Sequence, residues 1–268
     1  MLYEDYKYCI YFKVIMKTKQ ALVTCGGTGY RLRKGGMKFP VSKSFIEFKG
    51  HPMFYWCLLG LYYAGIERLV IVGDGAEKLR KAEHVLSDFP YNFSEVDWHE
   101  DPGFGSNELP YQARHLLDDY FFFECGHSIS EPEHYHRMED ELNDENGIVL
   151  SMFEPKSYAP RPLVRLDNHG ITTISQLTGA NNEFSVGSPR LLNQEYISKL
   201  PELEFNLYKI VEFYSSNGLL KLVRSNMPLE VNVIEEWKEA IPIYKKHIEK
   251  LCARARTSPN SLSSRPSF

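Results

Sequence analysis

The sequence predicts a single α/β domain in which helices flank a mainly parallel, twisted sheet. Short apolar runs typical of buried strands alternate with helical segments through the first half of the chain. The 268 residues, 43% of them hydrophobic, are enough for one domain with a full core. Strands joined through helices make right-handed crossovers, and these place successive strands parallel. Ligands of such sheets bind beyond the carboxyl ends of the strands.

The elements of the first half are separated by clear turn signals. Residues 21–25 (ALVTC) are an apolar run that stops at glycines, as a buried strand does. Residues 51–65 are expected to be a helix, because Pro52 suits its first turn and Gly65 its C-terminal cap. The next predicted elements are a strand at 67–72, a helix at 76–86, a weaker strand at 92–98, a helix at 108–117 and a strand at 120–125.

The second half is less regular. Strands are expected at 148–154, 163–166 and 184–187, with a hairpin turn at 168–170. Helices are expected at 194–199, 207–217 and 235–251, with a strand at 229–233 between the last two. We expect residues 1–15 to be an extension outside the fold and residues 16–252 to be the domain. Residues 253–268, rich in Ser, Pro and Arg, are expected to be a disordered tail.

Charge and cysteine content narrow the class of protein. A net charge of −4 and a pI near 6.2 argue against general nucleic-acid binding. The five cysteines are odd in number and scattered, with no CxxC pair, which favours a reduced cytoplasmic protein. The first residues include acids, and lysines interrupt their apolar run, so they do not read as a signal peptide. No apolar run approaches the roughly 20 residues that span a bilayer, so no membrane partner is expected.

The strongest functional signal lies just after the first predicted strand, in Gly26-Gly27-Thr28-Gly29. Glycines let the backbone adopt positive φ and turn its N–H groups towards a bound anion. The cationic residues that follow, before the next acid at Glu47, are Arg31, Arg33, Lys34, Lys38 and Lys43. Backbone amides beside concentrated positive charge suit a polyphosphate. The alternative interpretation is a glycine turn followed by a solvated basic loop.

Spacing excludes two common phosphate loops. No Gly-Lys pair follows the glycines, so the GxxxxGK[ST] loop is absent, which argues against a nucleotide-dependent kinase. The GxGxxG dinucleotide pattern is not matched either, and a basic segment is expected to intervene before any helix begins.

The stretch instead resembles the signature of the nucleotidyltransferase family, which includes the sugar-1-phosphate nucleotidylyltransferases. That signature is a strand, then GGxGTRL, a variable loop, and a lysine before a second apolar segment. The matching residues are Gly26, Gly27, Gly29, Arg31, Leu32 and Lys43, while Tyr30 stands where the family has Thr. Residues 230–240 resemble the family's closing strand and helix, and the likeness covers most of residues 17–250. It implies a Rossmann-like sheet of the nucleotide-diphospho-sugar transferase type, with a nucleotide-binding half (16–130) and an acceptor-binding half (131–252).

The resemblance also implies roles for these residues. Arg31 would hold the β- and γ-phosphates, and Lys43 would lie between the α-phosphate and the incoming phosphate. Main-chain groups of the loop Gly26, Gly27, Thr28 and Gly29 would contact the nucleotide. Gly105 and Ser106 resemble the family's loop that contacts the base or ribose. The implied partners are an NTP and a phosphorylated sugar or polyol; a homo-oligomer stays open.

The divalent cation of the family, Mg²⁺, is where the chain departs from the pattern. The family's usual Asp ligand after the fourth strand is His127 here, a poor ligand for a hard ion. The second ligand position falls on Asn232, with Glu230 two residues away. The site could use Mn²⁺, take an oxygen from Glu124 or Glu131, or bind nucleotide without turnover. A metal cluster of His127, His134 and His136 matches no standard zinc spacing.

Acceptor recognition is less clear from the sequence. Arg161, Arg165 and Arg190 are candidates for contacts with the acceptor's phosphate or sugar, and the alternative is that each is an ordinary surface arginine. We therefore expect a nucleotidyltransferase that joins an NTP to a sugar-1-phosphate or similar phosphorylated polyol. The alternative is a catalytically lapsed relative that binds nucleotide.

Overall fold

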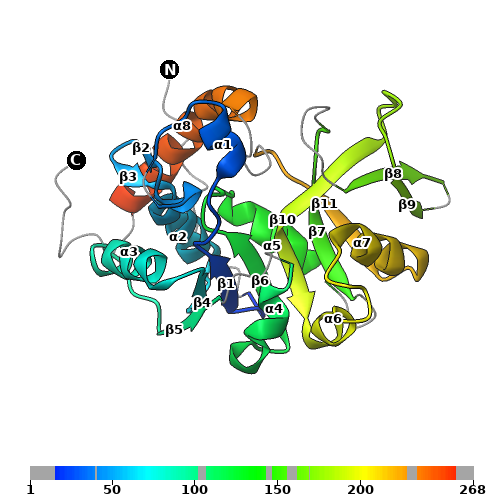
Figure 1. The fold of residues 1–268 in the computed structure, drawn as a ribbon, viewed down its shortest axis with the longest axis horizontal. Helices are drawn as coiled ribbons and strands as arrows, with labels where there is room; N and C mark the ends of the chain where they lie inside the picture. Colours follow the sequence, from blue (N-terminus) through cyan, green and yellow to red (C-terminus); the bar gives the residue numbers. More distant parts are fainter. Residues whose placement is uncertain are drawn as a thin grey trace, which may run out of the picture.

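The computed structural model describes residues 16–39, 41–101, 107–142, 147–155, 162–168, 170–227 and 234–257. Its centre is a nine-stranded sheet with the path order β11-β7-β10-β6-β1-β4-β5, to which β8 and β9 are added beside β10 (Figure 1). The strands are β1 Gln20–Thr24, β4 Arg68–Gly73, β5 Glu95–Glu100, β6 Tyr120–Cys125, β7 Ile148–Phe153, β8 Leu163–Asp167, β9 Gly170–Ile174, β10 Glu183–Asn193 and β11 Leu220–Arg224. The short strands β2 Glu47–Phe48 and β3 His51–Pro52 pair with each other.

The direction of the strands confirms the predicted mainly parallel sheet. β1 pairs in parallel with both β4 and β6, β4 with β5, and β7 with β11. On this path only β10 runs the other way, because it pairs antiparallel with β6 and β7. The carboxyl ends of β1, β4 and β6 therefore meet at one edge, which is where ligands of such sheets bind.

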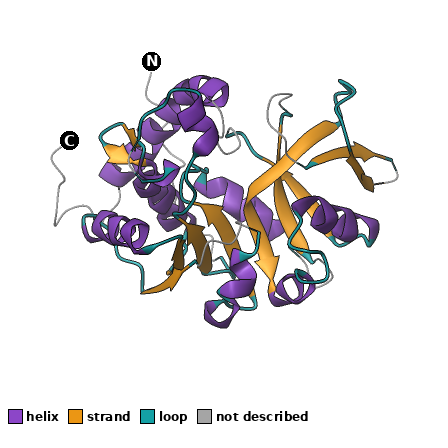
Figure 2. Ribbon diagram, viewed as in Figure 1, coloured by secondary structure: helices purple, strands orange, loops and turns teal. Residues whose placement is uncertain are grey.

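Helices cover both faces of the sheet (Figure 2). They are α1 Tyr30–Lys34, α2 Met53–Ala64, α3 Ala76–Ser87, α4 Leu109–Gln112, α5 Pro132–Asp140, α6 Gln194–Lys199, α7 Leu207–Ser216 and α8 Ile234–Thr257, with 3₁₀ turns at Lys43–Phe45 and Arg114–Leu116. Buried residues of α2, α3, α5 and α8 share one core cluster with Val23 and Phe122. Those of α4, α6 and α7 share the other with Leu22 and Phe123. Neighbouring residues of one strand thus face opposite cores, as the period of two requires.

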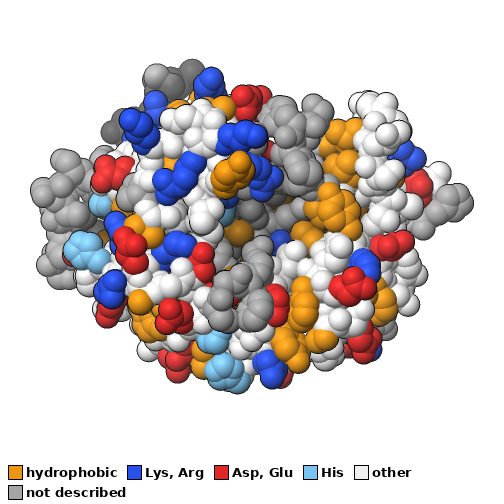
Figure 3. Space-filling view, in the orientation of Figure 1, with side chains coloured by type: hydrophobic (Ala, Val, Ile, Leu, Met, Phe, Trp, Pro, Cys, Tyr) orange, Lys and Arg blue, Asp and Glu red, His pale blue; other side chains and the backbone are white. Residues whose placement is uncertain are grey.

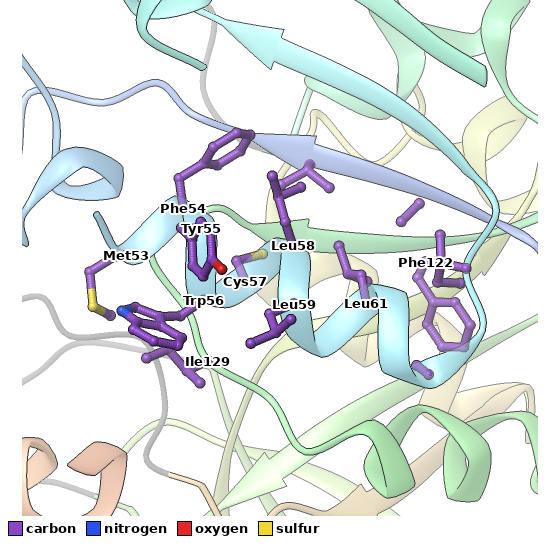
Figure 4. Close-up of a cluster of buried hydrophobic side chains, with 14 of the residues drawn as sticks. Met53, Phe54, Tyr55, Trp56, Cys57, Leu58, Leu59, Leu61, Phe122 and Ile129 are labelled. Atoms are coloured by element: carbon purple, nitrogen blue, oxygen red, sulfur yellow. The ribbon is translucent and has the colours of Figure 1, made fainter. Parts of the chain in front are cut away.

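Helix α2 is apolar all round because it lies inside the first core (Figure 4). Its residues from Met53 to Leu61 are all buried, and the indole nitrogen of Trp56 donates to the carbonyl of Phe48 at 2.7 Å. A Cβ at Gly60 would lie 2.9 Å from the carbonyl oxygen of Ser130, so glycine permits the approach of the segment after β6. The predicted cap is confirmed: Gly65 has φ 95°.

Several elements differ from the sequence-based expectation. A short helix, α1, begins directly after the glycines, where we expected an irregular basic loop. α5 and β11 were not foreseen, and β10 is much longer than the predicted strand at 184–187. All eleven residues of β10 are buried, but the segment contains Gly187 and Pro189, residues that usually end or interrupt a strand, so the sequence predicted only its first part. The strand expected at 229–233 lies outside the described residues.

The C-terminal helix is also longer than expected. α8 continues to Thr257, so residues 253–257 are helical rather than part of the tail we predicted. The helix packs Tyr244, Ile248 and Leu251 into the first core, and this anchors its last turns. None of the described helices has the length and apolarity needed to cross a membrane.

A buried carboxylate on the central strand β6 is satisfied entirely by the fold. Glu124 is fully buried, and its Oε2 accepts hydrogen bonds from the Tyr135 hydroxyl at 2.6 Å and the Ser130 hydroxyl at 3.2 Å. Its Oε1 accepts one from the backbone N–H of Cys125 at 3.0 Å. Burial, with the negative charge of Glu124, raises the pKa of Tyr135 well above its ordinary value, so the phenol stays protonated and donates. Glu124 therefore stabilises the packing of α5 on the sheet.

We predict that Tyr135→Phe destabilises the protein by about 1–3 kcal/mol, because it removes the shorter of the two side-chain hydrogen bonds to Oε2 of a buried carboxylate. The free energy of unfolding measured in urea checks this. Tyr208→Phe is the matched control, since Tyr208 is 48% exposed on α7. Equal stability of the two variants would contradict the structural role of Glu124.

Candidate active site

The glycine loop lies at the carboxyl end of β1, as the sequence predicts. Gly27 and Gly29 have φ of 84° and 61°, in the region that favours glycine. A Cβ at Gly29 would lie 2.5 Å from the ring of Phe39 and 2.8 Å from Cγ of Lys43. Glycine at this position therefore lets the loop and Lys43 lie against each other.

Helix α1 places cationic side chains directly after the loop. Arg33 secures the loop's shape, because its Nε donates to the carbonyl of Thr28 at 2.9 Å and its guanidinium lies 4.1 Å from the ring centre of Phe39. Arg31 is exposed on the same helix. Figure 3 shows Lys and Arg side chains gathered on this face, beside a hollow near its centre. An anion at the loop would meet this positive charge.

Lys43 and His127 are brought together from positions 84 residues apart. The Ser42 hydroxyl donates to the carbonyl of Cys25 at 2.9 Å, which fixes the 3₁₀ turn of Lys43 to the end of β1. His127 follows β6 after Gly126, and both Lys43 and His127 are buried. Lys43 Nζ lies 2.8 Å from Nε2 of His127. Because a lysine ammonium can only donate, Nε2 accepts this hydrogen bond.

Comparison with solved structures identifies the fold. An inositol-1-phosphate CTP transferase from T. maritima superposes with a TM-score of 0.68 at 20% identity, over 87% of this chain and 96% of that one. A Bacillus anthracis protein assigned as a glucose-1-phosphate thymidylyltransferase gives 0.68 at 16%, over 84% and 94%. A nucleotidyl transferase from Methanothermobacter thermautotroptrophicus gives 0.60 at 17%, over 87% and 99%. The chain has the fold of the sugar-phosphate nucleotidyltransferases.

No protein-family model and no curated protein matches the sequence. At 16–20% identity, these comparisons show a shared fold and do not by themselves assign an activity.

His127, which stands at an expected cation-binding position, does not suit Mg²⁺. The lone pair of Nε2 is used by the hydrogen bond from Lys43, so a cation there would lose its ligand and face an ammonium group. Asn232 and Glu230 lie outside the described residues. Among the described residues, no group of three His, Cys, Asp or Glu side chains could hold a metal ion.

The alternative ligands suggested by the sequence are engaged elsewhere. Glu124 is held in the core, and a carboxylate oxygen of Glu131 accepts from the side-chain amide of Asn226 at 3.1 Å. His134 Nε2 is 2.7 Å from the Ser151 hydroxyl, and burial and then the charge of Arg137 lower its pKa to about 3. His136 Nε2 donates to the carbonyl of Ala64 at 2.9 Å. Neither His134 nor His136 therefore faces His127 as part of a cluster.

The candidate acceptor arginines also have structural partners. Arg165 forms an ion pair with Glu183 at 2.7 Å, across the β8–β10 pairing. The hydrogen bonds from Arg165 and Thr178 hold the pKa of Glu183 down at about 2. Arg190 is buried, donates to the side-chain oxygen of Asn107 at 3.0 Å and lies 5.0 Å from the ring centre of Phe123. Arg161 and the predicted base-contacting pair Gly105 and Ser106 lie outside the described residues.

One residue at the loop was missed by reasoning from the sequence. The carboxylate of Asp74, directly after β4, accepts a hydrogen bond from the backbone N–H of Gly27 at 3.0 Å. Its signal was present in Gly73-Asp74-Gly75, an acid between two glycines at the carboxyl end of a buried strand.

We predict that His127→Asp raises the affinity for Mn²⁺ by about tenfold or more, because a carboxylate supplies the charged oxygen that a hard cation prefers. Titration followed by electron paramagnetic resonance measures the affinity directly, without any substrate. His127→Asn, similar in size and uncharged, is the control. Unchanged affinity in His127→Asp would show that the missing carboxylate is not what limits cation binding.

Proposed function

We propose that this chain is a nucleotidyltransferase that joins an NTP to a sugar-1-phosphate or a similar phosphorylated polyol. A phosphate oxygen of the acceptor attacks the α-phosphorus, the bond between the α-phosphorus and its bridging oxygen breaks, and pyrophosphate leaves. The observation that supports this most is the contact of the glycine loop with Lys43 at the carboxyl edge of a sheet with the nucleotidyltransferase fold.

The proposed chemistry needs negative charge to be neutralised on both sides of the α-phosphorus. Lys43 is held at the site by the Ser42 anchor and by His127, so its ammonium can offset the charge of the α-phosphate and of the incoming phosphate. Arg31, exposed on α1 just after the loop, would hold the β- and γ-phosphates as pyrophosphate departs. The amides of Gly26, Gly27, Thr28 and Gly29 would orient the nucleotide.

A divalent cation, Mg²⁺ or Mn²⁺, would add further neutralisation of the triphosphate. Because the geometry at His127 does not suit such an ion, the proposed catalytic groups are Lys43, Arg31 and the loop amides.

We propose further that the two halves of the domain divide the substrates. Residues 16–130 hold the glycine loop, Lys43 and His127, and would bind the nucleotide. Residues 131–252 include the hairpin of β8 and β9, which joins the sheet beside β10 off the main strand path, and would bind the acceptor (Figure 1). Since Arg165 and Arg190 are held by Glu183 and Asn107, we assign them to the shape of this half rather than to direct acceptor contacts.

The second candidate is a nucleotide-binding protein that has lost catalysis, and His127 is the observation that favours it. Pyrophosphate release from a panel of NTPs and sugar or polyol phosphates, with Mg²⁺ and then Mn²⁺, separates the two. Turnover with any pair supports the enzyme. Nucleotide binding without release under both metals supports the lapsed relative.

We predict that Lys43→Ala lowers turnover of the best substrate pair by on the order of a hundredfold or more, because it removes a preorganised charge at the reacting phosphate. Steady-state pyrophosphate release measures this, and circular dichroism checks the fold. Lys245→Ala, at an exposed position of α8, is the control and should retain activity. Full activity in Lys43→Ala would remove this residue from the site.

A further inference from the structure

Two donors from different elements converge on one oxygen beside the glycine loop. The backbone N–H of Gly27 donates to Oδ1 of Asp74 at 3.0 Å, and the ammonium of Lys78 donates to the same oxygen at 2.5 Å. Gly27 belongs to the loop after β1, and Lys78 to the first turn of α3. Asp74 lies between β4 and α3, so the order of β1 and β4 in the sheet brings the three groups together.

The carboxylate lies directly against the loop's backbone. A Cβ at Gly26 would be only 2.5 Å from Oδ1 of Asp74, so a larger residue at this position would displace it. The side chain of Lys78 is 11% exposed and that of Asp74 26%, so water screens the pair less than it screens a surface ion pair. Burial raises the pKa of the nearby Cys25 thiol to about 12, and the charge of Asp74 adds to this shift.

A phosphate oxygen makes the same demands on its surroundings as Oδ1 of Asp74. Both are anionic acceptors, and both are bound by backbone N–H groups and by lysine ammonium groups. The position that Oδ1 occupies is therefore suited to a phosphate oxygen. A phosphate there would repel the carboxylate, so both cannot be held by the same donors.

We propose that the Gly27 N–H and Lys78 form an anion subsite that takes a phosphate oxygen of the nucleotide, and that Asp74 fills this subsite when no nucleotide is bound. The identity of the anion rests on the proposed function. Asp74 thus keeps Lys78 and the loop in place and competes with the incoming phosphate. Lys78 becomes an additional phosphate-binding residue, with no counterpart among those suggested by the family signature.

Isothermal titration of the full chain tests this with inorganic tripolyphosphate, with CTP, UTP, GTP and ATP, and with the four matching nucleosides. Asp74→Asn should bind tripolyphosphate and the preferred NTP on the order of tenfold more tightly, because a charged competitor for two donors is removed. Nucleoside binding should not change. Lys78→Met should weaken triphosphate binding by a similar factor, while Lys81→Met, on the same helix, should not. Melting temperatures confirm that the variants are folded.

Three results would overturn the inference. Unchanged triphosphate affinity in Asp74→Asn would mean that no competition exists. Weaker binding of nucleosides and NTPs together would make Asp74 a direct nucleoside contact. If neither the unaltered protein nor any variant bound tripolyphosphate, the proposed subsite would be ruled out.

The pyrophosphate-release assay keeps this inference separate from the proposed function. Turnover by the unaltered protein, with no gain of affinity in Asp74→Asn, would reject the subsite and retain the enzyme. Tighter tripolyphosphate binding in Asp74→Asn, without turnover of any substrate pair, would retain the subsite and reject the enzyme.

Discussion

The close approach of β1 and β6 at their carboxyl ends is the constraint on which the site depends. The N–H of Gly126 donates to the carbonyl of Thr24 at 2.7 Å, and a Cβ at Gly126 would lie 2.6 Å from that same oxygen. Glycine is thus required where the two strands end. The residues that follow each strand are then forced together, which is why Lys43 and His127 meet although they are far apart in the sequence.

This arrangement gives the site an excess of positively charged and hydrogen-bond-donating groups. The groups around the glycine loop are mostly cations and backbone amides, and Asp74 supplies a carboxylate through an internal contact. The one carboxylate on β6, Glu124, points into the core, where it accepts hydrogen bonds from Tyr135 and Ser130. In the proposed reaction, a triphosphate placed here would be neutralised chiefly by the protein's own donors, and the role of His127 would be to hold Lys43 in place.

Local signals in the sequence were sufficient for the strands of the first half, the glycine loop and the α2 cap, because glycine, proline and apolar runs determine these within a few residues. The contacts of the site depend instead on strand order. Neither the Lys43–His127 pair nor the position of Asp74 follows from spacing along the chain. Helix α5 was missed because most of its residues are polar. Its buried residues are Pro132, His134, Tyr135 and Met138, which are too few to form a clear apolar pattern.

A crystal structure with a non-hydrolysable NTP analogue tests the central claim most directly. We expect the triphosphate against residues 26–43, with Lys43 Nζ within hydrogen-bonding distance of an α-phosphate oxygen and still beside His127. A triphosphate bound away from this loop, or crystals that take up none of the four nucleotides, would contradict it.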